Sequence, residues 1–158
     1  MANVTDDNVI EVPKETKEIG KQILEYKTLD VYIRKQGSLV FIEAFGPGGE
    51  WAETHTEMPD EEDMRTMTDS YKMAAVSGNS EKSVLDKLGD RLGNILMPGP
   101  ILQLYSAVLQ RTFAHPNKGL GLKLHFLSSS REYAWLPWEA IRINGRTIAM
   151  DPRQTIVR

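Results

Sequence analysis

The sequence predicts an α/β fold in which an antiparallel β-meander is followed by two or three amphipathic helices and then by further strands. Apolar residues alternate with polar ones in the first third, recur every three or four positions in the middle, and alternate again in the last third. A chain of 158 residues is also long enough to bury one core. With 41% hydrophobic and 26% charged residues, its composition is that of a globular protein rather than of a disordered one.

The segment "TLDVYIRKQGSLVFIEAF" predicts the first β-hairpin. Leu29, Val31 and Ile33 alternate with polar neighbours, the dipeptide "QG" interrupts the alternation, and apolar residues resume after it. The "GPGG" sequence at 46–49 predicts a second turn, and "EWAETHTEM" alternates again as a third strand. Together these segments predict the antiparallel meander.

The middle of the chain predicts helices. Pro59 precedes "DEEDMRTMTDSYKMAAV", whose acidic residues fall in a first helical turn, where the helix dipole favours negative charge. The apolar residues of this segment recur at helical spacing, at Met64, Met67, Tyr71 and Ala74. Ser80 is the expected N-cap of a second helix, "EKSVLDKLGDRLGNILM". The "PGP" sequence at 98–100 ends that helix, and "ILQLYSAVLQRTFAH" predicts a third.

The last third returns to strands. In "GLKLHFLSSS" three apolar residues alternate with polar ones, and "NG" at 144–145 is a strong signal for a tight hairpin. The apolar run "TIV" near the end predicts another strand, which would need a partner. The segment "KGLGLKL" around Gly119 and Gly121 resembles a dinucleotide-binding loop, but it precedes a strand instead of opening a helix. We therefore predict a turn there.

Composition and charge exclude several classes of function. A net charge of −3 and a pI near 5.7 argue against direct binding of nucleic acid. No apolar run approaches the roughly 20 residues that span a bilayer, so no membrane association is expected. The acidic start at 1–18 lacks the pattern of a signal peptide and of a folded element, and it predicts a flexible leader on a cytoplasmic chain whose domain spans 19–158. The absence of cysteine excludes disulfides, thiolate metal clusters and a cysteine nucleophile within these residues.

Three other groups of residues could carry chemistry, but each favours a structural interpretation. The acidic residues 60–63 fan out around a helix and cannot converge on one cation, so they predict a solvated first turn. His55, His115 and His125 lack the spacing of metal ligands, so neither a metal nor a cofactor is expected. A serine nucleophile at 128–130 with His125 is disfavoured, because no nucleophile-elbow pattern surrounds it and the histidine lies on the same short strand. We therefore predict no catalytic residue.

The segment "AWLPWEAIRINGRT" concentrates two tryptophans, a proline and a glutamate just before the hairpin signal. One interpretation is structural. Trp135 and Trp138 pack beneath the sheet, Pro137 fixes a turn, and Glu139 caps backbone amides or pairs with a buried cation. This interpretation predicts a contribution to stability rather than to activity.

A second interpretation comes from a family resemblance. The order of "MPG" at 97–99, the strand "LKLHF", the motif "LPWE" and the final "IAMDPRQTIVR" resembles the opening portion of a CHAT domain. This family belongs to the caspase and separase clan of cysteine peptidases and is often tied to bacterial defence and cell-death systems. The resemblance covers roughly residues 28–158. Its sharp motif consists of four residues, Leu136, Pro137, Trp138 and Glu139.

The resemblance implies a caspase-like sheet and a scaffold role for the motif. In this family the catalytic histidine and cysteine follow "LPWE", whereas the three histidines of this chain precede it, so no catalytic residue can be carried over. The resemblance therefore implies the non-catalytic N-terminal half of a cysteine peptidase, with a scaffold or regulatory role. The alternative is a stand-alone, catalytically inactive CHAT-like adaptor or recognition module that docks a partner protein.

The expected strand at 155–157 would leave a caspase-like sheet incomplete, since a strand edge needs a partner. We therefore expect a protein partner, either the missing catalytic half or another subunit of an assembly. Arg158 is the candidate processing site, because basic residues commonly precede the cleaved bond in this wider clan. A shortened chain, a piece separated by proteolysis and a separate gene product all remain open.

Overall fold

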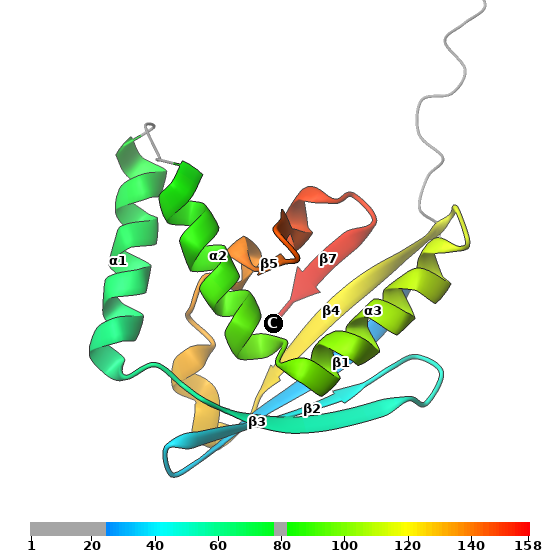
Figure 1. Cartoon of the computed structure of the whole chain (residues 1–158), viewed down its shortest axis with the longest axis horizontal. Coiled ribbons are helices and arrows are strands. Elements are labelled where there is room, and N and C mark those ends of the chain that lie inside the picture. The colour runs from blue at the N-terminus through cyan, green and yellow to red at the C-terminus, as the bar shows by residue number, and fades with distance from the viewer. Residues whose placement is uncertain (1–24, 78–81) are drawn as a thin grey trace, which may run out of the picture.

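The computed structural model describes residues 25–77 and 82–158 and has the expected α/β fold (Figure 1). The expected leader at 1–18 and the expected N-cap at Ser80 lie outside these residues. The elements in chain order are β1 (Glu25–Gln36), β2 (Leu39–Phe45), β3 (Trp51–Glu57), α1 (Glu61–Ser77), α2 (Lys82–Leu96), α3 (Gly99–Phe113), β4 (Lys118–Phe126), the 3-10 helices η1 (Ser128–Tyr133) and η2 (Trp138–Ala140), β5 (Arg142–Ile143), β6 (Arg146–Thr147), the 3-10 helix η3 (Ile148–Met150) and β7 (Gln154–Val157).

Five strands form one mixed sheet in the order β3-β2-β1-β4-β7. The pairs β1–β2 and β2–β3 are antiparallel, which is the predicted meander. The pairs β1–β4 and β4–β7 are parallel. Parallel neighbours need crossover connections. Helices α1–α3 lie in the connection that leads into β4, and residues 127–153 form the connection from β4 to β7.

The core lies between the sheet and the helices. The alternation predicted for β1 is confirmed, since Leu29, Val31 and Ile33 are buried, and α3 packs across the sheet from β3 to β4. Helix α2 packs against α1 on one side and against η2 and β5 on the other. Figure 1 shows α3 lying along the sheet and the α1–α2 pair standing beside the crossover segment.

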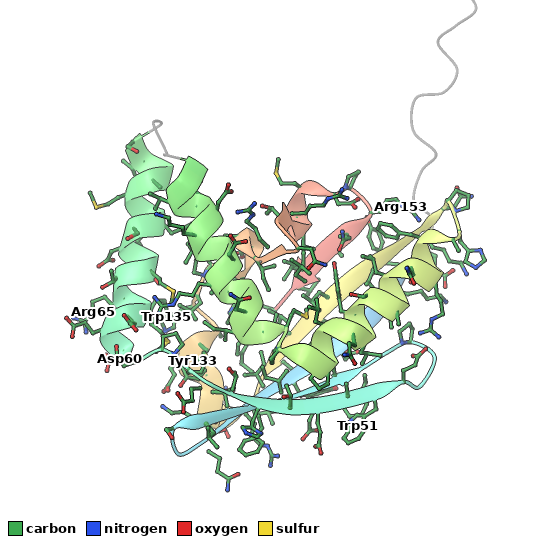
Figure 2. All side chains as sticks on the ribbon, viewed as in Figure 1. Trp51, Asp60, Arg65, Tyr133, Trp135 and Arg153 are labelled. Carbon is green, nitrogen blue, oxygen red and sulfur yellow. The ribbon has the colours of Figure 1, made fainter. Side chains whose placement is uncertain are left out.

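The opposite face of the sheet, which we call the outer face, carries aromatic side chains. The ring of Tyr32 stacks on His125 with centroids 4.3 Å apart and meets Phe45 edge-on at 5.8 Å. Trp51 lies beside Phe45 on the neighbouring strand and is 54% exposed. Figure 2 shows the Trp51 ring on the side of the sheet away from the helices. The outer face thus remains partly open to solvent over β1–β3.

The turn predicted at "KGLGLKL" is wrong, because Gly119 and Gly121 lie inside β4. A Cβ atom at Gly119 would lie 2.6 Å from the ring of Tyr26 and 2.7 Å from the carbonyl oxygen of Arg153. The Tyr26 ring lies across Gly119, and its hydroxyl donates a hydrogen bond to the carbonyl of Pro152 at 3.0 Å. Glycine is therefore needed here for a close approach of other groups within a strand, not for a turn.

The hairpin predicted at "NG" is confirmed. Asn144 and Gly145 have φ values of 52° and 75°, the left-handed conformations that a tight two-residue turn requires. Arg142 fixes this hairpin to α2, because its guanidinium lies 3.2 Å from an Asp86 carboxylate oxygen and 3.3 Å from one of Asp90. The same guanidinium donates to the Gly145 carbonyl at 2.7 Å.

Candidate functional site

The "LPWE" motif lies in the crossover segment between β4 and β7. Leu136 is fully buried and Trp138 is 1% exposed. The indole N–H of Trp138 donates to the carbonyl of Tyr133 at 2.9 Å, and its ring lies 5.8 Å from that of Phe126 at the end of β4. Pro137 is the residue that precedes η2, so the chain turns there. The motif therefore packs the crossover segment against the end of β4.

The structural interpretation of this segment holds for one tryptophan and is wrong for the other. Trp135 is 48% exposed. Tyr133 and Leu136 are the side chains of this turn that enter the core, and Trp135 stays outside it. Glu139 does pair with a cation, but the pair is half-exposed rather than buried.

That cation is Arg158, so the structure brings together the motif glutamate and the candidate processing residue. One guanidinium nitrogen of Arg158 donates to the carbonyls of Ala134 at 2.9 Å and Leu136 at 3.2 Å, and the other pairs with the Glu139 carboxylate. Arg158 follows β7 and thus fastens the end of that strand to the motif. A protease that recognised Arg158 would have to withdraw it from all three acceptors.

Replacing Glu139 with glutamine is expected to lower the free energy of unfolding by less than about 1 kcal/mol, because exposed ion pairs contribute little. The Arg158 guanidinium keeps its two carbonyl acceptors in this variant. Urea unfolding followed by circular dichroism measures the effect. Glu132→Gln is the matched control, since Glu132 is equally exposed and pairs with Lys35. A loss well beyond the control value would show that the Glu139 carboxylate orients the crossover segment.

Two of the three serines after β4, Ser129 and Ser130, form hydrogen bonds with β1. Ser130 is fully buried and donates to the carbonyls of Ile33 at 2.5 Å and Leu127 at 3.0 Å. His125 instead lies 2.7 Å from an Asp30 carboxylate oxygen. Within the described residues, no hydrogen bond joins His125 to a serine. In this geometry His125 is not placed to act as the base for a serine nucleophile.

The acidic residues at 60–63 lie at the start of α1, as expected. The Asp60 carboxylate accepts the backbone N–H of Asp63 at 2.8 Å, and Asp63 also pairs with Arg91 of α2 at 2.9 Å. Figure 2 shows Asp60 and Arg65 at this end of α1. In the part of the chain that the structure describes, no group of three or more histidine, aspartate or glutamate side chains is placed to hold a metal ion.

A cavity of about 960 Å³ opens beside β7, between α3 and the β5–β6 hairpin. Its walls combine apolar and polar side chains from segments far apart in the sequence, among them Tyr105, Leu109, Phe113, Ile143, Met150 and Gln154. Sequence reasoning missed this cavity, because no single segment carries a pattern for it. The Tyr105 hydroxyl, on α3, hydrogen-bonds to the side-chain oxygen of Gln154, the first residue of β7.

Tyr105 should make the protein less stable at high pH. Burial, together with the nearby charge of Asp151, raises the pKa of Tyr105 to about 12 from an ordinary value of 10. The unfolded chain therefore loses this proton first, so the contribution of Tyr105 is intact below pH 10 and is lost as the pH rises towards 12. We expect a loss of about 2 kcal/mol from this group over that range. Urea unfolding across the range should show the loss, and Tyr105→Phe should lack it.

No single helix in the described ranges 25–77 and 82–158 is long and apolar enough to cross a membrane. By length and composition, one bent pair would pass that test, Val84–Leu96 with Gly99–Phe113, at 100° to each other.

Comparisons of the chain with protein-family models, with curated proteins and with solved structures find no match in any of the three. The likeness to the CHAT domain therefore rests on the residues of the motif and of the segments around it.

Proposed function

We propose that this chain is the non-catalytic N-terminal part of a CHAT-type, caspase-like cysteine peptidase, and that it acts in the cytoplasm within a bacterial defence or cell-death system. Its role there is to support the fold or to form a regulatory interface. The observation that carries the proposal is the joint placement of the four "LPWE" residues and Arg158. Two segments that resemble the family separately meet at one contact between Glu139 and Arg158.

The placement of this contact supports a scaffold role. The motif lies in the crossover between two parallel strands. The Trp138 indole hydrogen-bonds to the Tyr133 carbonyl within this segment, and Arg158 joins the end of β7 to the Leu136 carbonyl. Ligands and reacting groups in open parallel sheets gather at the carboxyl ends of the strands. Arg158 follows the carboxyl end of β7, so the motif holds this end of the sheet in place for residues that would come from another segment.

Catalysis in such an enzyme requires a cysteine, which these 158 residues do not contain, and a histidine that follows the motif. A cysteine thiolate would attack the peptide carbonyl carbon, and a histidine would transfer the proton to the leaving amine. The sequence contains no cysteine. The residues of this chain would therefore act on the reaction only by holding the sheet that positions a catalytic segment.

The test uses the protein isolated from its native source through an N-terminal tag. The preparation is treated with an iodoacetamide probe, its polypeptides are weighed by intact mass spectrometry, and cleavage of a mixed peptide library is followed. We expect a labelled cysteine-bearing polypeptide, joined to or bound by this chain, and cleavage that the probe abolishes. A lone, unlabelled 17.8 kDa chain without cleavage would contradict the proposal. A fluorophosphonate probe is expected to leave this chain unlabelled, since no hydrogen bond joins a histidine to any of the three serines at 128–130 within the described residues.

The adaptor role is the second candidate, and the edge of the sheet favours it. Among the described strands only β4 pairs with β7, and Val157 at the end of β7 is 47% exposed. An extended segment of a partner could add to this edge by backbone hydrogen bonds. The same preparation separates the two roles, because an adaptor would bring down a partner without probe-sensitive cleavage.

A further inference from the structure

Strand β3 is the other edge of the five-stranded sheet, and among the described strands only β2 pairs with it. The Gly46 N–H donates to the Glu50 carbonyl at 2.8 Å, so Gly46 and Glu50 are a hydrogen-bonded pair. The register of β2 and β3 then shows which of the following pairs are hydrogen-bonded. Because hydrogen-bonded and non-hydrogen-bonded pairs alternate in an antiparallel ladder, every second residue of β3 directs its backbone away from β2. These residues are Trp51, Glu53, His55 and Glu57.

We infer that two copies of this chain pair through their β3 edges, antiparallel about a two-fold axis at Thr54, and form one continuous ten-stranded sheet. A two-fold axis places the same patch on both copies, so the edge must complement itself. This inference does not depend on the proposed peptidase role. The four outward N–H and C=O groups on each copy would satisfy one another across the axis.

The register follows from side-chain alternation. Successive side chains of a strand point to opposite faces, so the two strands can pair only where odd-numbered residues face odd-numbered ones. Full overlap of the seven residues places Thr54 opposite Thr54 and Glu53 opposite His55 of the second copy. Threonine pairs are favourable across strands, and a histidine ring N–H can donate a hydrogen bond to the glutamate carboxylate that faces it.

Neighbouring registers are disfavoured by charge. Shifting one strand by two residues places Glu53 opposite Glu53 in one direction and Glu53 opposite Glu57 in the other, and like charges directly opposite are destabilising. The register with the longest overlap is therefore also the register with complementary side chains. This coincidence is what favours a second copy over an unrelated strand as the occupant of the edge.

The surroundings leave Glu53 and His55 available for this pairing. Arg34 lies 3.6 Å from Glu43 on the neighbouring strands, and the His55 ring lies 5.9 Å from that of Phe41. Within the described residues Glu53 and His55 form no ion pair with each other or with a neighbour, and both are exposed. At the other edge, β7 offers four residues instead of seven, so β3 gives the longer ladder.

The test is the mass in solution, measured by sedimentation equilibrium over a range of concentrations. We expect a reversible equilibrium between 17.8 kDa and twice that mass. Amide hydrogen exchange at Glu53 and His55 should slow as the dimer forms, because their N–H groups become hydrogen-bonded. A protein that stays monomeric into the millimolar range would overturn the inference.

Charge substitutions test the register. Glu53→Lys removes the carboxylate acceptor that faces His55, and His55→Glu places a glutamate opposite Glu53, each of them twice by symmetry. Each change should weaken dimerisation roughly tenfold. The double variant Glu53→His/His55→Glu should restore it, because a glutamate and a histidine again face each other.

Asp69→Lys is the control for Glu53→Lys. It makes the same change of charge at an exposed position of α1 and should leave the dimer unchanged. Circular dichroism shows whether each variant is folded. A wild-type dimer that the single changes do not weaken, or that the double change does not restore, would place the contact on another surface and refute the β3 register.

Discussion

Replacing Trp138 with alanine is expected to lower the free energy of unfolding by about 3–5 kcal/mol. The side chain is 1% exposed, and the change would leave a cavity between the crossover segment and the end of β4, where Phe126 lies 5.8 Å away. It would also remove the indole donor to the Tyr133 carbonyl. Urea unfolding followed by far-ultraviolet circular dichroism measures the loss without depending on tryptophan fluorescence.

Trp135→Ala is the matched control, because it removes the same side chain three residues earlier from a half-exposed position. We expect a change within about 0.5 kcal/mol, as for most surface substitutions. Equal losses in the two variants would contradict the placement of Trp135 outside the core. They would instead support the interpretation in which both tryptophans pack beneath the sheet.

Local patterns were sufficient to predict the meander, the three helices and the tight hairpin. The stripe of Met64 and Met67 lies on the buried side of α1, because residues three and four apart share one face of a helix. Asn144 and Gly145 form the predicted turn, since few residues adopt positive φ at two successive positions. In each case the residues that determine the structure lie within a few positions of one another in the sequence.

Contacts between distant segments could not be predicted in this way. Gly119 was expected in a turn, but the groups that require glycine there are Tyr26 and Arg153, which lie far away in the sequence. The pairing of Glu139 with Arg158 likewise depends on how the crossover segment returns to the sheet. No local pattern distinguishes the buried Trp138 from the exposed Trp135, because both are large, apolar and close to the same proline.

The two edges of the sheet allow the two proposed associations to coexist. Dimerisation would use β3, whereas a catalytic segment or another partner would add at β7, and three strands separate these edges. A dimer through β3 would therefore leave both copies of the "LPWE" contact free. If the peptidase proposal is correct, the assembly would hold two catalytic units at opposite ends of one sheet.

Gly93→Ala is expected to lower the free energy of unfolding by about 3 kcal/mol, because a Cβ atom at this position would lie 2.0 Å from the carbonyl oxygen of Arg142. One turn earlier on α2, a Cβ atom at Gly89 would lie 2.3 Å from the carbonyl oxygen of Ala140. These two glycines let α2 lie directly on the backbone that follows the motif. The obstructing atoms belong to backbone, so they can yield only if the crossover segment moves. Urea unfolding measures the loss.

Gly99→Ala is the control, since no atom lies within 4 Å of its added Cβ and the residue also begins a helix. That change should leave the stability unaltered or raise it by up to about 1 kcal/mol, because alanine restricts the unfolded chain. Helix propensity alone would make Gly93→Ala stabilising by a similar amount. The sign of the effect at Gly93 therefore decides whether α2 rests on the motif segment: a gain would contradict that packing, and a loss would show that the crossover holding Trp138 and Glu139 is supported from α2.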